Sequence, residues 1–205
     1  MKPTPIKTYN FSITKGSIYF RETKAIVETY VQIKDWEGVF ESVKEHEVFR
    51  GVKLPTFKTK FPLIKNRIET LPVDLIEQDF DDDEWLLVFY IACCEYHEYL
   101  KDLVLDLIYE KYLILQPQLT EDDYRSFLFN KMDEQPELEA VTTNTLYKIR
   151  QVVMLILADA GVLDSTKSWR IQKPYTSDYL ASKLKEHNKL YLKYLLWTDY
   201  EINQL

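Results

Sequence analysis

Two cysteines and a histidine near the middle of the chain are the first candidates for chemistry. Cys93, Cys94 and His97 are of types that bind zinc, and Cys94 and His97 are spaced to share one face of a helix. A structural zinc site needs four ligands, however, and the remaining histidines, His46 and His187, are isolated in the sequence. A catalytic thiol needs electropositive surroundings, whereas this segment is acidic and apolar. We therefore expect inert core cysteines, no metal and no cofactor.

Acidic residues are concentrated between Asp74 and Glu110. This segment holds twelve acidic residues and one basic residue, a balance of −11, which leaves +4 on the rest of a chain whose net charge is −7. The acidic run 81–83 suits the start of a helix, where backbone N–H groups are unpaired. No calcium-loop spacing follows this run, and no basic substrate clamp lies beside it. We expect solvated helix faces and no enzymatic activity; the alternative is a face that docks a basic partner or repels DNA.

Basic residues are concentrated in two stretches that contain no acid, 48–68 and 165–176. Salt screens charges beyond about 8 Å, so a polyanion responds to such local fields rather than to the net charge. The alternative is that these lysines only solvate helix faces. The candidate DNA-binding residues come from both stretches and from a predicted helix before the second: Arg50, Lys53, Lys58, Lys60, Lys65, Arg67, Lys148, Arg150, Lys167, Arg170 and Lys173.

The elements that must position these residues are predicted to be helices, because apolar residues recur at helical spacing along the chain. The run Trp85 to Cys94 is apolar on all sides and predicts a central buried helix. The pattern around it leaves open one long helix or two helices joined near His97. The predicted helices cover about 17–33, 35–45, 56–71, 81–116, 120–132, 145–160 and 177–188, the last with an optional continuation through 190–197.

Two groups of elements have the order of DNA-binding units. Residues 35–71 read as helix, break at Gly51 and helix, which is the layout of a helix-turn-helix. Residues 120–173 read as two helices and then the single hairpin signal of the chain, at about 162–172, which is the order of a winged helix-turn-helix. The apolar run 152–157 must be core. The first turns of the second helix can therefore face a major groove, and they offer Thr143, Asn144, Tyr147, Lys148 and Gln151.

Length and composition set the limits of the fold. The chain has 205 residues, of which 46% are apolar and only four are glycine, so it can bury a sizeable core but has no glycine-rich phosphate loop. We expect a compact all-α bundle with at most one hairpin, made of an arm (1–16) and two helical subdomains (17–72 and 73–205) packed together. Adjacent cysteines, no signal peptide and a longest apolar run of ten residues indicate a cytoplasmic protein with no membrane span.

Several stretches together resemble the BrxA family, small proteins of the BREX bacteriophage-exclusion systems. The first is FRETKAIVETYVQIKDWEGVFESVKEHEVF, and it is followed in order by IKNRIETLP, LLVFYIACCEYHEYLKDLVLDLIYEKY and LTEDDYRSFLFNKMDEQPELEAVTTNTLYKIRQVVMLILADAGVLD. The chain departs from the family at His46 and Val48, near a break where Asn is usual. Some members have been labelled inner-membrane proteins, which the short apolar runs here contradict.

The resemblance implies a compact all-α protein that binds double-stranded DNA within a multi-gene defence system and is not catalytic. The resemblance does not identify individual residues that contact DNA. The candidates therefore remain those chosen by their charge and their position in this sequence. We expect contacts mainly to phosphates, possible partners among other BREX components, no membrane and no second copy of the chain. Two alternatives stay open: a protein scaffold that acts through the acidic 74–110 surface or the N-terminal arm, and an RNA-binding helical module of the antitermination-factor type.

Overall fold

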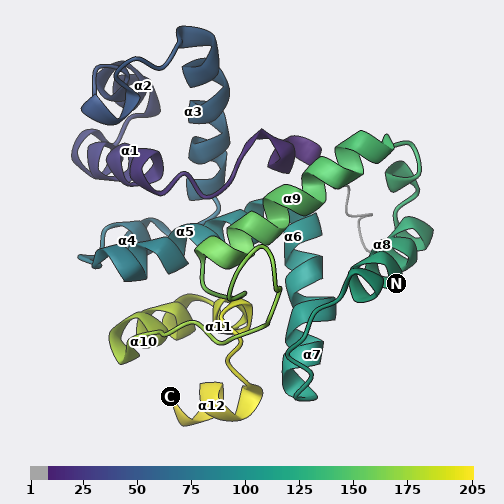
Figure 1. Ribbon diagram of the computed structural model, residues 1–205. Helices are drawn as coiled ribbons and strands as arrows, with labels where there is room; N and C mark the ends of the chain where they lie inside the picture. The colour runs from purple at the N-terminus through teal and green to yellow at the C-terminus, as the bar shows by residue number, and fades with distance from the viewer. Residues whose placement is uncertain (1–8) are drawn as a thin grey trace, which may run out of the picture.

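The computed structural model describes residues 9–205 as an assembly of helices (Figure 1). Residues 1–8 of the predicted arm lie outside the described residues. The first half of the chain contains η1 (Phe11–Lys15), α1 (Phe20–Ile33), α2 (Trp36–Lys44), η2 (Glu47–Phe49), α3 (Leu54–Ile68), α4 (Val73–Ile76), α5 (Asp82–Tyr96) and α6 (Glu98–Asp102). The second half contains η3 (Leu103–Tyr109), α7 (Glu110–Leu113), α8 (Glu121–Glu134), η4 (Pro136–Leu138), α9 (Thr143–Asp159), α10 (Asp178–His187), α11 (Lys189–Tyr194) and α12 (Asp199–Gln204).

Helix α5 lies at the centre of the molecule, as its apolar sequence predicts. Its residues from Leu87 to Cys94 are all buried, and α1, α3 and α11 pack against it. The helix begins with a capping box, in which Asp81 accepts from the backbone of Glu84 and the Glu84 side chain accepts from the backbone of Asp81. The acidic run therefore starts a helix, as expected. The all-α fold class is confirmed.

The helical segment that follows α5 is interrupted at His97, which resolves the question of one helix or two. Residue His97 has extended backbone angles between α5 and α6. The chain then continues into η3, a seven-residue π-helical stretch, and α7. Leu115 closes this segment in the left-handed region, with φ of 58°.

The first helices pack through aromatic rings. Phe40 of α2 contacts Phe57 and Phe61 of α3 at centroid distances of 5.1 Å each, and Trp36 stacks on Tyr30 of α1 at 4.2 Å. Helix α3 was predicted at 56–71 and spans 54–68 instead. It starts earlier because a proline is favourable in a first helical turn, where its missing N–H has no partner to lose.

The segment from α8 to residue 172 has the predicted order of two helices and a hairpin-like loop. Thr120 and Asp123 form a capping box at α8, and Gly161, with φ of 70°, follows the end of α9. The loop is closed by an isolated antiparallel bridge between Leu163 and Ile171, and no strand forms within residues 9–205. We call residues 162–172 the wing loop.

The last part of the chain consists of three short helices. The predicted helix at 177–188 is α10, and its optional continuation is a separate helix, because Asn188 ends α10 and its side chain caps α11. One hydrophobic core runs from Tyr9 to Ile202 and includes all of these segments. In the described part of the chain, no helix has the length and apolar character needed to cross a bilayer.

Candidate nucleic-acid interface

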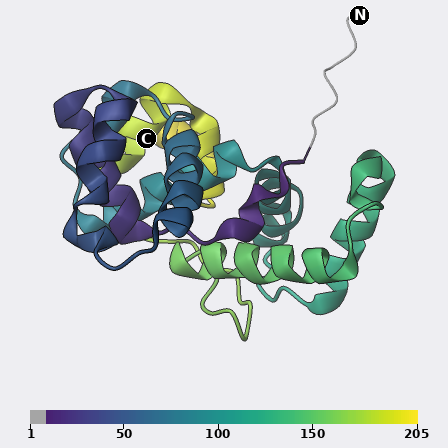
Figure 2. The ribbon, with the colours of Figure 1, turned by 90° about the horizontal axis from the view of Figure 1, so that it is seen from above.

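A groove of about 610 Å³ separates α9 from the wing loop. Figure 2 shows α9 lying along one side of the molecule, with the wing loop projecting beside it. The groove is lined by Tyr147, Arg150, Gln151 and Leu155 of α9, by Glu121 of α8, and by Thr166, Lys167, Ser168 and Trp169 of the wing loop, with Leu119 and Met154 completing it. The helix and the loop that a winged helix-turn-helix would present to DNA therefore share one concave surface.

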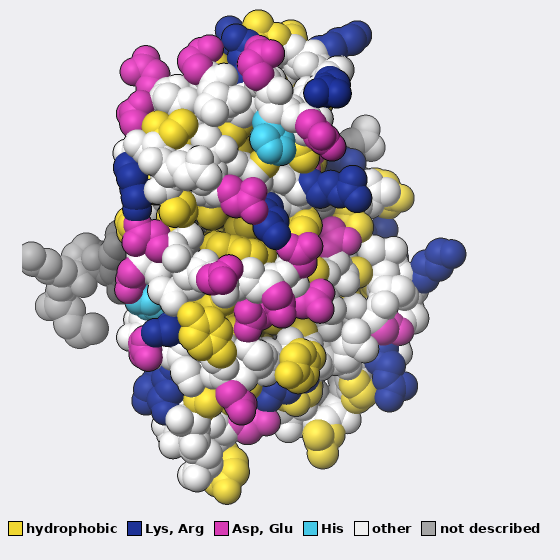
Figure 3. Space-filling view, turned by 90° about the vertical axis from the view of Figure 1, so that its left-hand side faces the viewer, with side chains coloured by type: hydrophobic (Ala, Val, Ile, Leu, Met, Phe, Trp, Pro, Cys, Tyr) yellow, Lys and Arg dark blue, Asp and Glu magenta, His cyan; other side chains and the backbone are white. Residues whose placement is uncertain are grey.

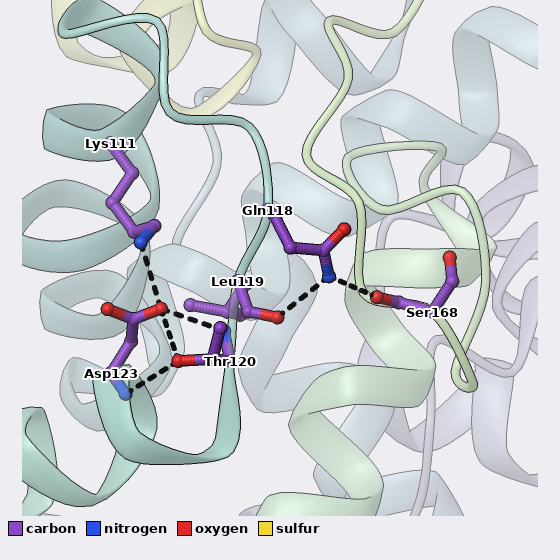
Figure 4. A network of polar contacts seen from close by, with 6 residues as sticks. All are labelled: Lys111, Gln118, Leu119, Thr120, Asp123 and Ser168. Atoms are coloured by element: carbon purple, nitrogen blue, oxygen red, sulfur yellow. Dashed lines mark hydrogen bonds and ion pairs between the residues drawn. The ribbon is translucent and has the colours of Figure 1, made fainter.

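The wing loop is attached to the start of α8 by a polar network (Figure 4). Gln118 Nε2 donates to the carbonyl of Ser168 at 2.6 Å and to that of Leu119 at 3.1 Å. At α8, Lys111 Nζ donates to Asp123 Oδ2 at 2.8 Å. Partial burial opposes ionisation, but the hydrogen bonds from Lys111 and Thr120 keep the pKa of Asp123 below its usual value. This network holds the wing loop against the segment that leads into α8.

The turn of the wing loop is organised around Asp164. Its carboxylate accepts from the hydroxyl of Ser168 and, at 2.9 Å, from the backbone N–H of Arg170. These hydrogen bonds lower the pKa of Asp164. Trp169 adopts the left-handed region, with φ of 54°, and its indole N–H donates to the carbonyl of Thr166 at 3.0 Å. The conformation is uncommon for an aromatic residue, and it places Trp169 in the groove wall.

Part of the second set of predicted cations is exposed on α9 and the wing loop. Lys148, Lys167 and Arg170 are exposed on α9 and the wing loop, and none forms an ion pair within residues 9–205. Arg150 lines the groove but pairs with Glu121. Lys173 is turned away from the groove, because its ammonium group pairs with Glu201 of α12 at 2.8 Å and lies 4.2 Å from the Trp197 ring centroid.

The first basic stretch is divided in the same way. Arg50, Lys53 and Lys58 are exposed and have no ion-pair partner in the described part of the chain. Lys60 pairs with Glu22 of α1 at 2.7 Å, and Lys65 pairs with Glu69 at 3.7 Å, one turn along α3. Three of the six predicted cations in this stretch are therefore not free: Lys60 and Lys65 form ion pairs, and Arg67 is buried.

Arg67 does not lie on the surface, so it is removed from the candidate set. Its side chain is 2% exposed and donates to His97 Nε2 at 3.1 Å and to the carbonyls of Ser17 and Gly16 at 2.6 and 3.1 Å. These acceptors use the guanidinium donors that a phosphate would need. Burial, reinforced by the charge of Arg67, lowers the pKa of His97 to about 2, against a weaker backbone contact with Asn10. His97 is therefore a neutral acceptor.

Three residues that line the groove are not among those predicted from the sequence to face DNA. Leu155 belongs to the apolar run that was assigned to the core, yet it is 39% exposed and lines the groove. Trp169 and Glu121 line the groove as well. The spacing of Leu155 from Tyr147, Lys148 and Gln151 puts these residues on one helix face, which is the signal that would have placed Leu155 outside.

In the part of the chain that it describes, the structure does not supply the further ligands or the exposed thiol that a metal or catalytic site at Cys93 and Cys94 would need. Cys93 and Cys94 are buried, and burial raises the pKa of both thiols. Among residues 9–205, no three His, Cys, Asp or Glu side chains are grouped as a metal site would require. Acidic side chains are most frequent across the middle of the face that carries α4 and α10 (Figure 3).

Two comparisons with known proteins identify the same family. The family model BrxA matches residues 7–188 of the chain. A curated relative from Paramagnetospirillum magneticum, "BREX protein BrxA", is 22% identical over 191 residues, which cover 90% of this chain and 94% of the relative. A crystal structure of an uncharacterized protein from Magnetospirillum magneticum superposes with a TM-score of 0.75 at 19% identity, covering 93% of this chain and 98% of that one. The structural likeness supports the fold.

Proposed function

Because the chain belongs to the BrxA family of BREX components, we propose that it is a non-enzymatic protein that binds double-stranded DNA in BREX-type bacteriophage defence. The observation that carries this proposal is the charge around the groove. Lys167 lines the groove, and Lys148 and Arg170 lie on the same two elements, α9 and the wing loop, which are those that a winged helix-turn-helix uses. All three side chains are exposed and form no ion pair within the described residues. Such cations gain most from a polyanion, because no internal pair must be broken first.

The contacts that these residues offer are mainly to phosphates. Lysine ammonium groups carry charge without a fixed donor geometry, and they position a duplex without reading its sequence. The acidic residues of the groove rim are few, whereas the acidic face carrying α4 and α10 lies elsewhere (Figure 3). The molecule would therefore approach DNA in one orientation, with the acidic face directed away from the phosphates.

A salt titration of duplex binding tests the proposal. We expect log Kd to rise linearly with log salt, with a slope of about 0.9 per phosphate contacted. The triple variant Lys148→Glu, Lys167→Glu, Arg170→Glu should bind more weakly and with a smaller slope. Lys44→Glu, a reversal on α2, is the matched control and should change neither quantity. Equal binding by the triple variant and the parent protein would reject the groove as the interface.

A second function is favoured by the acidic face of Figure 3, which suits a basic protein partner. As a scaffold within the BREX complex, the protein would co-purify with such a partner, and reversal of exposed acids on α4 and before α5 would abolish the association while leaving duplex binding unchanged. The RNA alternative is tested in the same titration, because tighter binding to single-stranded or A-form RNA than to duplex DNA would favour it.

A further inference from the structure

Arg150, a cation that lines the groove, is paired with an acid, and an acid beside it would not favour a phosphate ligand. Arg150 Nη1 donates to the carboxylate of Glu121, the first residue of α8. The guanidinium carbon also lies 5.2 Å from the ring centroid of Tyr147 and 5.9 Å from that of Trp169. Residues from α8, α9 and the wing loop therefore hold one guanidinium group at the groove surface.

The pair is held in position but is not hidden. The Arg150 side chain is 26% exposed and that of Glu121 is 48% exposed, and both residues line the groove. A guanidinium group has five N–H donors, and within residues 9–205 only Nη1 of Arg150 has a hydrogen-bond acceptor. The groove thus offers unused donors on Nε and Nη2 directly beside a carboxylate that can accept.

A phosphate is a poor ligand for such a pair, because it would approach the Glu121 carboxylate together with Arg150 and be repelled. A neutral base edge meets no such repulsion. In the major groove a G·C pair presents two acceptors, guanine N7 and O6, next to one donor, the cytosine N4 amino group. Arginine donors match the first two, and a carboxylate matches the third.

We propose that the Arg150–Glu121 pair recognises a G·C base pair through its major-groove edge, an inference that rests on the proposed duplex binding. Arg150 would donate hydrogen bonds to guanine, and Glu121 would accept one from cytosine. The flanking cations Lys148, Lys167 and Arg170 supply affinity without sequence preference. The paired residues supply a preference for guanine, which the phosphate contacts alone would not give.

Modified duplexes of a single GC-containing sequence test this reading. Replacing guanine with 7-deazaguanine removes the N7 acceptor, whereas inosine keeps N7 and O6 and alters only the minor groove. We expect 7-deazaguanine to weaken binding about 5- to 150-fold and inosine to leave it nearly unchanged. Equal binding of the unmodified and 7-deazaguanine duplexes would overturn base reading while leaving duplex binding intact. Absence of any duplex binding would instead reject the proposed function.

Two conservative variants separate base reading from charge. Arg150→Lys keeps the charge but loses the fixed fork of donors, so it should retain salt-dependent binding and lose the discrimination against 7-deazaguanine. Glu121→Gln can still accept from Arg150 and removes the negative charge, so it should bind duplexes more tightly overall and with less preference for guanine. Circular dichroism confirms that each variant is folded. Unchanged discrimination in both variants would overturn the assignment.

Discussion

Arg67 Nε donates a hydrogen bond to His97 Nε2 at 3.1 Å in the interior of the protein. The contact joins the last turn of α3 to the break between α5 and α6, and the same guanidinium holds the carbonyls of Gly16 and Ser17 before α1. All these acceptors are neutral, and no carboxylate bonds Arg67 within residues 9–205. A side chain that looks like part of a DNA-binding stretch is therefore a structural connection.

Truncation of Arg67 is expected to destabilise the protein strongly. Arg67→Ala leaves three acceptors without their donor, the buried His97 Nε2 and two half-buried carbonyls, and we expect a loss of about 3 kcal/mol in the free energy of unfolding. Arg125→Ala on α8, where the side chain is 74% exposed, is the control and should change stability by less than about 0.5 kcal/mol. Urea denaturation measures both. A loss for Arg67→Ala no larger than the control's would contradict the structural role.

Acidification is expected to unfold the protein in part through His97. Its pKa is lowered to about 2 by burial and by Arg67, against about 6.5 in an unfolded chain. The unfolded state therefore binds the extra proton first. The stabilisation is complete above pH 6.5 and is lost as the pH falls below it, by up to about 1.4 kcal/mol per pH unit.

A variant that keeps the acceptor without the titration isolates this effect. His97→Gln can still accept from Arg67, so its stability should depend less on pH between 6.5 and 4. Denaturant titrations at several pH values measure the difference in the free energy of unfolding between the two proteins, which should shrink steadily on acidification. A difference that does not change with pH would show that His97 has the same pKa in the folded and unfolded states.

The capping residues and the buried stripe were the features that the sequence predicted well. Thr120, Asp123 and Gly161 act through neighbours within a few residues, so their roles depend only on local sequence. The burial of Arg67 depends on Gly16 and His97, which are far from it in the chain. Arg67 and Lys60 are seven residues apart on one flank of the apolar stripe of α3, and contacts made by other segments decide that both are engaged.

The groove was predicted only in part, for the same reason. The order of α8, α9 and the wing loop is readable from caps, apolar spacing and Gly161. The pairing of Arg150 with Glu121 is not, because the two residues are 29 positions apart in the sequence and only the tertiary fold brings their side chains together. A basic stretch read from the sequence therefore overestimates the free positive charge.

The two cysteines are expected to be unreactive in the folded protein. Cys93 and Cys94 are buried within α5, and burial raises the pKa of both thiols, so little thiolate forms. We expect a thiol reagent such as Ellman's reagent to label neither residue at neutral pH under native conditions and to label both in denaturant. Rapid labelling of either thiol in the native protein would contradict their placement.

Loosening the wing loop should weaken DNA binding more than it weakens the fold. Gln118→Ala removes the hydrogen bond from Gln118 Nε2 to the Ser168 carbonyl, while the backbone bond from Ile171 to Pro117 at 2.7 Å remains. We expect a stability loss of about 1 kcal/mol, faster amide hydrogen exchange at 165–170 and weaker duplex binding. Gln116→Ala, an exposed neighbour, is the control. Unchanged exchange at 165–170 would show that Gln118 does not restrain the loop.

The slope of the salt titration can show whether the two basic stretches bind one duplex. η1 packs against both α3 and α9 and connects the two surfaces. If only Lys148, Lys167 and Arg170 contact phosphates, the slope should be about 2.7, since each contact contributes about 0.9. If Arg50, Lys53 and Lys58 bind the same duplex, the slope should be about twice as large, and reversing those three residues should reduce it to the smaller value. A smaller slope that is unaffected by their reversal would confine the interface to the groove beside α9.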